Sequence, residues 1–302
     1  LLLLNNLLFS AAAAMVLIGT LSPLLFEALN LGKISVGPPY FASQFFWLMA
    51  PVVLLLPFGP FARWGSETFS KLWPALRASL ILAVIGAACA MLLGNGLPFK
   101  AIIGLTGTAW ILGGTGLYAW QRIRQLPAGR RIAAETLGML LAHAGMAIFI
   151  AGVLVVETVG IEKDVAVSPS QETEVLGYRF RFDGVSEHQG ANFKASRGSI
   201  TVFDGERQIA VLHPEKRAYA SGGQVMTEAA IAPGLMRDLY VALGEPLGAG
   251  NWALRIYVKP MVRWIWLGAL FMFAGGLIVA MDRRFRREYN LQNAVTPDSG
   301  AA

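Results

Sequence analysis

The sequence predicts a polytopic α-helical membrane protein with about six transmembrane helices and an inserted small all-β domain outside the membrane. Three observations lead to this fold class. First, 55% of the 302 residues are hydrophobic and only 15% are charged, and the mean hydropathy is +0.53. Second, six apolar runs are long enough to cross a bilayer. Third, a polar stretch of about a hundred residues separates the fifth run from the sixth.

The apolar runs divide the chain into four regions. They cover residues 3–29, 41–61, 78–95, 98–120, 132–157 and 260–281. We therefore expect a five-helix transmembrane region at 1–158, an external β domain at 159–259, a sixth transmembrane helix at 260–282, and a basic, disordered cytoplasmic tail at 283–302.

Basic residues orient these crossings, because short cytoplasmic connections carry an excess of lysine and arginine. Eleven of them lie on alternate connections: Arg63, Lys71, Arg77, Arg122, Arg124, Arg130, Arg131, Arg283, Arg284, Arg286 and Arg287. The other two short connections hold only Lys33 and Lys100. We therefore expect the chain to enter from the cytoplasm and to place its β domain outside. The net charge of +6 gives no reason to expect nucleic acid as a partner, whereas the basic cluster at 282–288 could also contact anionic membrane lipid.

Glycine and proline mark the connections between the runs. The segment 32–39 holds two glycines and two prolines, which predict a short, non-helical external loop. Asn95 and Gly96 predict a tight turn before the fourth run. Five glycines in that run favour close contact with neighbouring helices: Gly104, Gly107, Gly113, Gly114 and Gly116.

The polar stretch shows the patterns of short strands. SITVF at 199–203 and QIAVL at 208–212 flank the turn DGER, which predicts a β-hairpin, and ALRIYVKP at 253–260 predicts a strand that leads into the last crossing. We expect a small antiparallel barrel or sandwich. No catalytic constellation is present in it. His188 and His213 lack matching metal ligands and are expected at exposed loops or strand ends.

The single cysteine, Cys89, excludes an intramolecular disulfide, a CxxC redox pair and a CxxCH haem-attachment site within this sequence. It is expected to be a small buried residue of the third run. The sequence begins with LLLLNNLLF, inside an apolar run and without an initiator methionine. We therefore expect the chain to be the downstream part of a longer protein whose N-terminal half carries the rest of any site.

His143 is the leading candidate for a functional residue. It lies near the middle of the fifth apolar run, which has no charge between Glu135 and Glu157. An ionisable group at that depth faces the protein interior and pairs with a partner, an ion or a cofactor. Imidazole is a common axial ligand of haem iron, and small neighbours such as Ala142 and Gly145 would let a flat macrocycle approach. The same small residues would equally suit a packed histidine that bonds a neighbouring helix.

Several motifs resemble the C-terminal half of the CcmF family, the cytochrome c-type biogenesis (haem lyase) membrane subunit. They are LLLLNNLLFS, LSPLLFEALNLGKISVGPPYF, LAHAGMAIFIAGV, PEKRAY, MTEAAI, RDLYVALGEPL and VKPMVRWIWLGALFMFAGGL, which follow one another along nearly the whole chain. The resemblance implies a subunit of the bacterial inner membrane that takes haem from a periplasmic haem chaperone and attaches it to the CxxCH thiols of apocytochrome c. A thiol-handling assembly subunit is a further implied partner.

The resemblance also assigns a cofactor to His143. In the family a haem b in the membrane keeps the transferred iron reduced, and by its place in LAHAGMAIF, His143 matches one axial ligand, which makes it the expected cofactor-binding and metal-binding residue. We expect its Nδ1 proton to be held by a backbone carbonyl or a small polar side chain. The second axial ligand, the family's tryptophan-rich segment and its two external histidines belong to the N-terminal half, so this part alone is not expected to be active.

Two other classes of function remain open from the residues alone. A secondary transporter or haem exporter would show repeated halves with broken helices, and no such repeat is visible. A scaffold, in which the β domain only docks partners, is compatible with a domain that shows interaction surface and no chemistry. A b-type absorption spectrum would separate the haem-binding protein from both alternatives.

Overall fold

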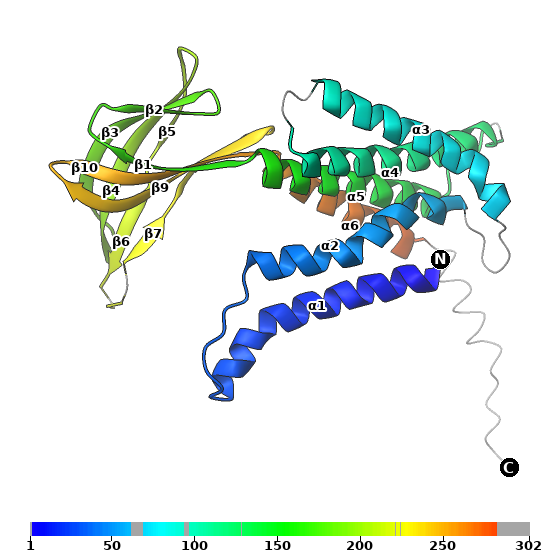
Figure 1. Cartoon of the computed structure of the whole chain (residues 1–302), viewed down its shortest axis with the longest axis horizontal. Helices are drawn as coiled ribbons and strands as arrows, with labels where there is room; N and C mark the ends of the chain where they lie inside the picture. The colour runs from blue at the N-terminus through cyan, green and yellow to red at the C-terminus, as the bar shows by residue number, and fades with distance from the viewer. Residues whose placement is uncertain are drawn as a thin grey trace. The chain divides into compact units, whose positions relative to one another are not determined.

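A computed structural model of the chain describes residues 2–61, 69–93, 97–127, 129–220, 222–223 and 225–282. The predicted tail at 283–302 lies outside these residues. The described helices are α1 Leu2–Ala28, α2 Pro38–Leu55, the 3₁₀ segment η1 Leu56–Phe61, α3 Phe69–Leu93, α4 Phe99–Arg124, α5 Ala134–Val159 and α6 Val262–Ala280 (Figure 1). The strands lie between α5 and α6.

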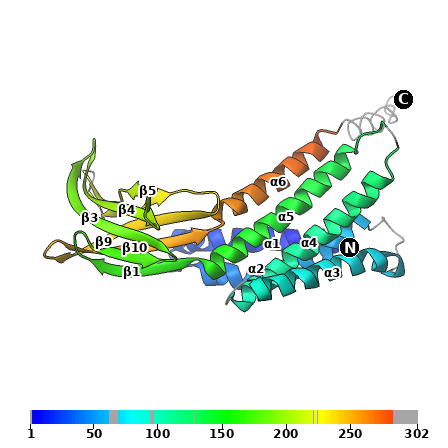
Figure 2. The ribbon, with the colours of Figure 1, turned by 90° about the horizontal axis from the view of Figure 1, so that it is seen from above.

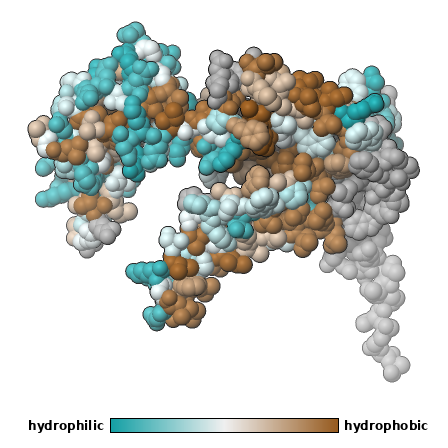
Figure 3. Space-filling model, viewed as in Figure 1, coloured by the Kyte–Doolittle hydropathy of each residue, from teal (hydrophilic) through white to brown (hydrophobic). Residues whose placement is uncertain are grey.

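The chain folds as two units. The helical unit contains α1, α2, η1 and α3 with most of α4, α5 and α6, and the β unit contains the strands with the adjoining ends of α4, α5 and α6. Hydrophobic side chains cover much of the helices, whereas hydrophilic side chains are more frequent over the strands (Figure 3). This contrast is the one expected between a membrane region and a water-exposed domain.

Five helical segments among the described residues are long and apolar enough to span a membrane: Leu3–Ala28, Pro39–Phe61, Phe99–Arg124, Ala134–Val159 and Val262–Ala280. The remaining long helix, α3, contributes the shorter apolar segment Leu76–Leu92. The predicted fold class, a helical membrane protein with an inserted all-β domain, is confirmed. The described residues provide five clear spans and one shorter apolar helix, where the sequence predicts about six crossings.

The second predicted crossing is not one continuous α-helix. It begins at Pro38, earlier than expected, because proline suits the first turn of a helix, where no amide hydrogen is needed. At Leu56 the α-helix gives way to η1, whose sequence is LPFGPF. Pro57 and Pro60 cannot donate backbone hydrogen bonds to the α-helical ladder, so the chain tightens into a 3₁₀ segment.

Helices α5 and α6 run side by side in both views (Figures 1 and 2). In the helical unit, Gly145 of α5 meets Gly268 of α6: a Cβ on Gly145 would lie 2.7 Å from the Gly268 carbonyl oxygen and 2.8 Å from the Met272 nitrogen. One further contact of this kind joins Gly138 to Gly275. The two glycines of each helix are seven residues apart, so the backbones touch along one face of each helix.

Helix α4 packs closely against its neighbours at two of the five glycines for which helix contacts are predicted. A Cβ on Gly113 would lie 3.3 Å from the Ser79 Cα of α3, and one on Gly114 would lie 2.6 Å from the Pro57 Cβ of η1. Gly116 has no atom within 4 Å of its Cβ position. The predicted role of these glycines in helix contact is therefore confirmed for Gly113 and Gly114 and wrong for Gly116.

The β unit is built from two antiparallel sheets. Its described strands are β1 Ile161–Val167, β2 Glu172–Val175, β3 Tyr178–Gln189, β4 Phe193–Asp204, β5 Arg207–Leu212, β6 Glu215–Tyr219, β7 Met226–Glu228, β8 Ala230–Ala232, β9 Arg237–Gly248 and β10 Asn251–Pro260. One sheet has the order β1-β10-β9-β8 and the other β2-β3-β4-β6-β7, with β5 also paired to β4.

Alternating side chains from both sheets form the core of this unit. Phe180, Phe182 and Ile200 come from one sheet and Leu239 and Ile256 from the other, and each is at most 1% exposed. The predicted hairpin is present as β4 and β5, which pair from Ile200 to Asp204. The predicted final strand is β10, which ends at Pro260, directly before α6.

The close approach of α5 and α6 can be tested with two adjacent glycines. A Cβ at Gly275 would collide with the Gly138 carbonyl oxygen and lie 2.8 Å from the Ala142 nitrogen, whereas one at Gly276 would meet nothing within 4 Å. We expect Gly275→Ala to destabilise the protein by about 1–3 kcal/mol through overpacking. Gly276→Ala, the matched control, should be neutral or stabilising by about 0.5–1 kcal/mol. Thermal unfolding in detergent measures both, and equal midpoints would contradict the packing described.

Candidate functional site

The ring of His143 is oriented by its own helix. Its Nδ1 atom lies 2.9 Å from the carbonyl oxygen of Met139, one turn earlier in α5. A carbonyl oxygen only accepts hydrogen bonds, so this contact places the ring proton on Nδ1. The lone pair of Nε2 is then available to bind a metal. The predicted bond between Nδ1 and a backbone carbonyl is present.

The Nε2 edge of His143 faces the backbone of η1. A Cβ on Gly59 would lie 3.9 Å from Nε2, and no side chain exists at that position. The backbone of Leu56 also interacts with the ring. His143 itself is half-buried. The nitrogen that would bind a ligand therefore lies beside the η1 backbone, at a position where glycine adds no side chain.

Contacts with α4 hold η1 in this position. Pro57 is fully buried against Gly114. Two aromatic pairs flank it, one between Phe58 and Trp110 with ring centroids 6.2 Å apart. The other joins Phe61 to Tyr118 at 5.5 Å. These edge-on contacts fix the 3₁₀ segment that carries Gly59.

His143 and the glycine face of α5 lie on different sides of the helix. With about 3.6 residues per turn, His143 is roughly opposite Gly138 and Gly145. On its own side, one turn later, the Ala147 carbonyl oxygen accepts a hydrogen bond of 3.4 Å from the Thr108 hydroxyl of α4. Helix α5 thus presents small residues to α6 and its imidazole to η1.

The donor set fits one axial position of a haem iron. An axial histidine needs an oriented Nδ1 proton and an unprotonated Nε2, and the bond from Nδ1 to the Met139 carbonyl meets both requirements. No group of three or more histidine, cysteine, aspartate or glutamate side chains that could hold a metal ion occurs among the described residues. A single imidazole suits haem, whose porphyrin provides the other four ligands, better than a multi-ligand ion site.

The other histidines belong to the β unit. His188 lies at the end of β3, half-buried, with its ring 6.2 Å from that of Phe193. His213 follows β5, is exposed, and has Nδ1 3.2 Å from the Gly198 carbonyl oxygen. The predicted strand-end placement is thus confirmed for both. Lys33 and Lys100, the basic residues of the other two short connections, are exposed.

The expectation that Cys89 is buried is wrong. Cys89 is a free, exposed cysteine of α3. It shares one helical face with Leu82, Ile85 and Leu92, whose side chains are 48–80% exposed. In a membrane helix such a face meets lipid, where a small apolar thiol is as well accommodated as in a core.

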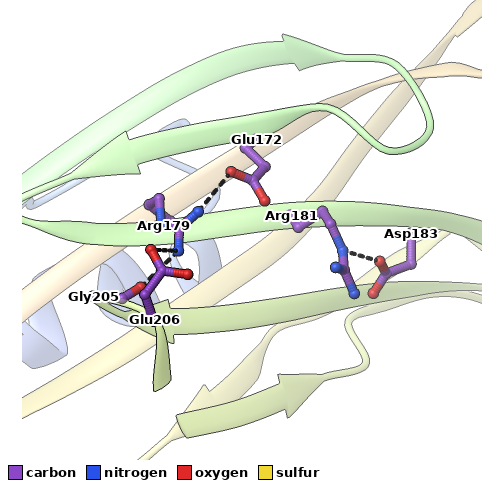
Figure 4. A network of polar contacts seen from close by, with 6 residues as sticks. All are labelled: Glu172, Arg179, Arg181, Asp183, Gly205 and Glu206. Carbon is purple, nitrogen blue, oxygen red and sulfur yellow. Dashed lines mark hydrogen bonds and ion pairs between the residues drawn. The ribbon is translucent and has the colours of Figure 1, made fainter. Parts of the chain in front are cut away.

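Charged side chains of the β unit pair with one another. Arg179 of β3 bonds Glu172 of β2 at 3.1 Å, and in the β4–β5 turn it bonds the Gly205 carbonyl oxygen at 2.7 Å and Glu206 at 3.3 Å (Figure 4). Farther along β3, Arg181 bonds Asp183 at 2.8 Å (Figure 4). The Arg179 contacts join neighbouring strands, whereas the Arg181–Asp183 pair lies within β3, and none of the residues drawn is an activated nucleophile.

Glu215 is the most buried carboxylate in these networks, with a side chain only 4% exposed. It accepts hydrogen bonds from Arg197 and, at 2.7 Å, from Arg217. Burial raises the pKa of the Glu215 carboxyl, but the bonds and charges of the two arginines outweigh it and leave the pKa below the ordinary glutamate value. The group is therefore ionised at neutral pH and serves to join β6 to β4.

Comparison with known proteins shows what the chain is similar to. The model of the CcmF C-terminal beta-sandwich matches residues 158–260. The cytochrome c-type biogenesis protein CcmF of Pseudomonas aeruginosa is 43% identical over 294 residues, covering 95% of this chain. CcmF of Escherichia coli K12 is 39% identical over 97% of it. The chain matches the C-terminal half of CcmF proteins.

A solved CcmF structure shares the fold. The chain termed Cytochrome c Heme Lyase CcmF superposes with a TM-score of 0.70 at 22% identity, over 93% of this chain and 45% of its own length. The chain also spans only 44% of the Pseudomonas CcmF and 45% of the Escherichia one. Nearly the whole of this chain is matched, but it corresponds to less than half the length of these CcmF proteins.

Gly59 and η1 are the part of the site that sequence reasoning missed. The prediction treats residues 41–61 as one crossing and assigns no role to Gly59. The signal was nevertheless present, because LPFGPF places two prolines and a glycine within six residues. Such a cluster inside a membrane segment indicates a break in the helix, which is tolerated where the backbone is buried in protein.

The role of Glu215 can be tested by changing it to glutamine. Because the folded carboxyl has a lowered pKa, its ionised form stabilises the β unit at neutral pH, and this contribution is lost as the pH falls through the folded pKa. We expect Glu215→Gln to cost roughly 1–3 kcal/mol at pH 7 and clearly less in acid. Glu206→Gln is the control, since that side chain is 99% exposed. Hydrogen exchange of β4 and β6 at both pH values measures the effect, and a loss independent of pH would contradict it.

Proposed function

We propose that this chain is the C-terminal part of a cytochrome c haem lyase subunit, in which His143 supplies one axial ligand to a haem b within the membrane. The names of its relatives, cytochrome c-type biogenesis protein and heme lyase, give the process. The observation that carries the proposal is the orientation of His143, whose Nδ1 bonds the Met139 carbonyl and whose Nε2 faces Gly59. A histidine that merely fills space between helices needs neither feature.

The residues of the chain contribute binding and orientation. The Met139 carbonyl holds the Nδ1 proton, which fixes the tautomer and makes Nε2 more basic. Gly59 puts no side chain beside Nε2, and the aromatic pairs of η1 and α4 hold the 3₁₀ segment that carries it. A bound haem b supplies reversible one-electron chemistry, with a potential set by its axial ligands and burial.

The second axial ligand would come from the N-terminal half of the same protein, because the described residues show one oriented imidazole at this position. The complete subunit would take haem from a periplasmic haem chaperone and join it to the CxxCH thiols of apocytochrome c, together with a thiol-handling subunit. In that assembly the helices span the bacterial inner membrane and the β unit lies in the periplasm. No residue of this chain is assigned a catalytic role, and this part alone would be inactive.

A scaffold or haem-transport subunit without a redox role is the alternative. It is favoured by the β unit, whose charged residues pair with one another and whose histidines lie at strand ends. In that case, the β unit would dock partner proteins and His143 would only pack α5 against η1. The two functions differ in whether the purified membrane protein carries a b-type haem on His143.

Replacing His143 with glycine tests the axial ligand directly. We expect His143→Gly to lose most of the b-type signal in a dithionite-reduced minus oxidised spectrum of the full-length detergent-purified protein. Added imidazole should restore it, because the small ligand can occupy the vacated space. His188→Ala, which removes a histidine from β3, should keep the full signal.

Retention of the signal in a folded His143→Gly protein would reject His143 as a ligand and favour the scaffold. Loss of the signal without rescue by imidazole, accompanied by a lower unfolding temperature, would show that the residue acts through packing.

A substitution at Gly59 tests whether a side chain beside Nε2 disturbs the haem. Gly59 does not have a positive φ, but it precedes Pro60, whose ring disfavours a β-branched residue in a helical turn, so the unfolding midpoint of the variant is measured alongside its spectrum. A Cβ would lie 3.9 Å from Nε2, and the methyl groups of valine extend beyond it. We expect Gly59→Val to weaken or shift the b-type spectrum while the protein stays folded. Gly116→Val, at a position with no atom within 4 Å, is the matched control, and equal spectra of the two variants would contradict the assignment.

A further inference from the structure

The loop between β8 and β9 exposes two large apolar side chains. This loop, residues 233–236 with the sequence PGLM, presents Leu235 with 68% and Met236 with 59% of its surface exposed. Tight connections between strands usually carry polar residues, because they face water. Two adjacent exposed apolar residues at the tip of a short loop therefore indicate a surface that meets something apolar.

Three hydrogen bonds fix the loop, two of them to the beginning of α6. The Met261 amide donates to the Met236 carbonyl oxygen at 2.8 Å. The indole Nε1 of Trp264 donates to the Leu235 carbonyl oxygen at 3.0 Å. Within the loop, the Gly234 amide donates to the buried Asp238 carboxylate at 2.9 Å. The apolar tip thus has a defined position beside the first turn of α6.

For an α6 that crosses the membrane, that position falls at the edge of the bilayer. Helix α6 begins at Val262 and is apolar enough to span a bilayer from its first residue. Its first turn therefore lies where hydrocarbon meets the headgroups, and a loop bonded to that turn lies at the same depth. The tryptophan side chain that makes one of these bonds is typical of this interface.

Basic side chains beside the loop match the chemistry of lipid headgroups. The Arg263 side chain is 51% exposed, and its nearest carboxylate, that of Asp238, is 3.7 Å away. Arg237, directly after the loop, stacks on the Tyr178 ring with 4.5 Å from its guanidinium carbon to the centroid. Its Nε atom has no hydrogen-bond partner among the described residues. A phosphate group would suit the exposed cation of Arg263.

We propose that the 233–236 loop inserts Leu235 and Met236 into the outer surface of the phospholipid bilayer, with Arg263 at the level of the lipid phosphates. Apolar side chains at the headgroup boundary, flanked by arginine and tryptophan, have the composition of an interfacial anchor. The β unit is then attached to the membrane by a third element, besides its two covalent connections to α5 and α6.

Leu247 provides an internal control for this proposal. It is a leucine at the other end of β9, 53% exposed, and ten residues beyond Arg237 along the strand. At about 3.3 Å per residue, the two ends of β9 are separated by more than the thickness of a headgroup layer. Both leucines are exposed, Leu235 just before β9 and Leu247 near its end. They differ in their distance from α6.

The experiment places a fluorescent probe at each leucine in turn. Leu235→Cys and Leu247→Cys are made in the full-length protein without other cysteines, Cys89→Ala included, and labelled with an environment-sensitive dye. The proteins are reconstituted into vesicles of phosphatidylethanolamine and phosphatidylglycerol, with or without lipid that carries a spin label near the top of its acyl chain. We expect the dye at position 235 to emit at shorter wavelength and to lose at least half of its intensity to the spin-labelled lipid, and the dye at 247 to do neither.

Three results would overturn the proposal. The first is a dye at position 235 that is as polar and as weakly quenched as the dye at 247, which would mean that the loop faces water. The second is an apolar but unquenched dye at 235, which would mean that protein covers the loop. The third is equal quenching at both positions, which would remove the link to α6. Repeating the measurement with Met236→Cys separates a property of the loop from an effect of one substitution.

Discussion

The close contact between the backbones of α5 and α6 is the constraint on which the rest of the structure depends. Gly138 and Gly145 meet Gly275 and Gly268 at distances that no side chain allows, so one face of α5 is committed to α6. These are also the two helices that lead into and out of the β unit. The opposite side of α5 is left to carry His143 toward η1, which links the packing of the helices to the placement of the candidate ligand.

Local patterns made most of the fold predictable. The apolar runs, the DGER hairpin and the strand before α6 depend on nearest neighbours along the chain, and each is found where its pattern indicates. His143 could be selected for a similar reason, since an ionisable residue within an apolar helix is conspicuous. Its bond to Met139 is also local, four residues away on the same helix.

Properties that depend on distant segments were not predictable. Gly59 matters because η1 packs against α4 and faces α5, and nothing in its neighbours along the chain specifies either contact. Cys89 is exposed because of the face of α3 that it occupies, whereas composition alone suggested burial. The partners of Glu215 likewise follow from strand pairing, which brings Arg197 of β4 beside β6.

Under the proposed function, the bond between His143 and Met139 has a consequence for how the haem site is assembled from separate parts. It lies within a single turn of one helix, so the imidazole acquires this orientation when α5 forms. An oriented ligand loses little rotational entropy when it binds iron. One axial ligand can therefore be oriented in one polypeptide segment and the second axial ligand in another. The two segments then need to meet only at the haem that both ligands bind.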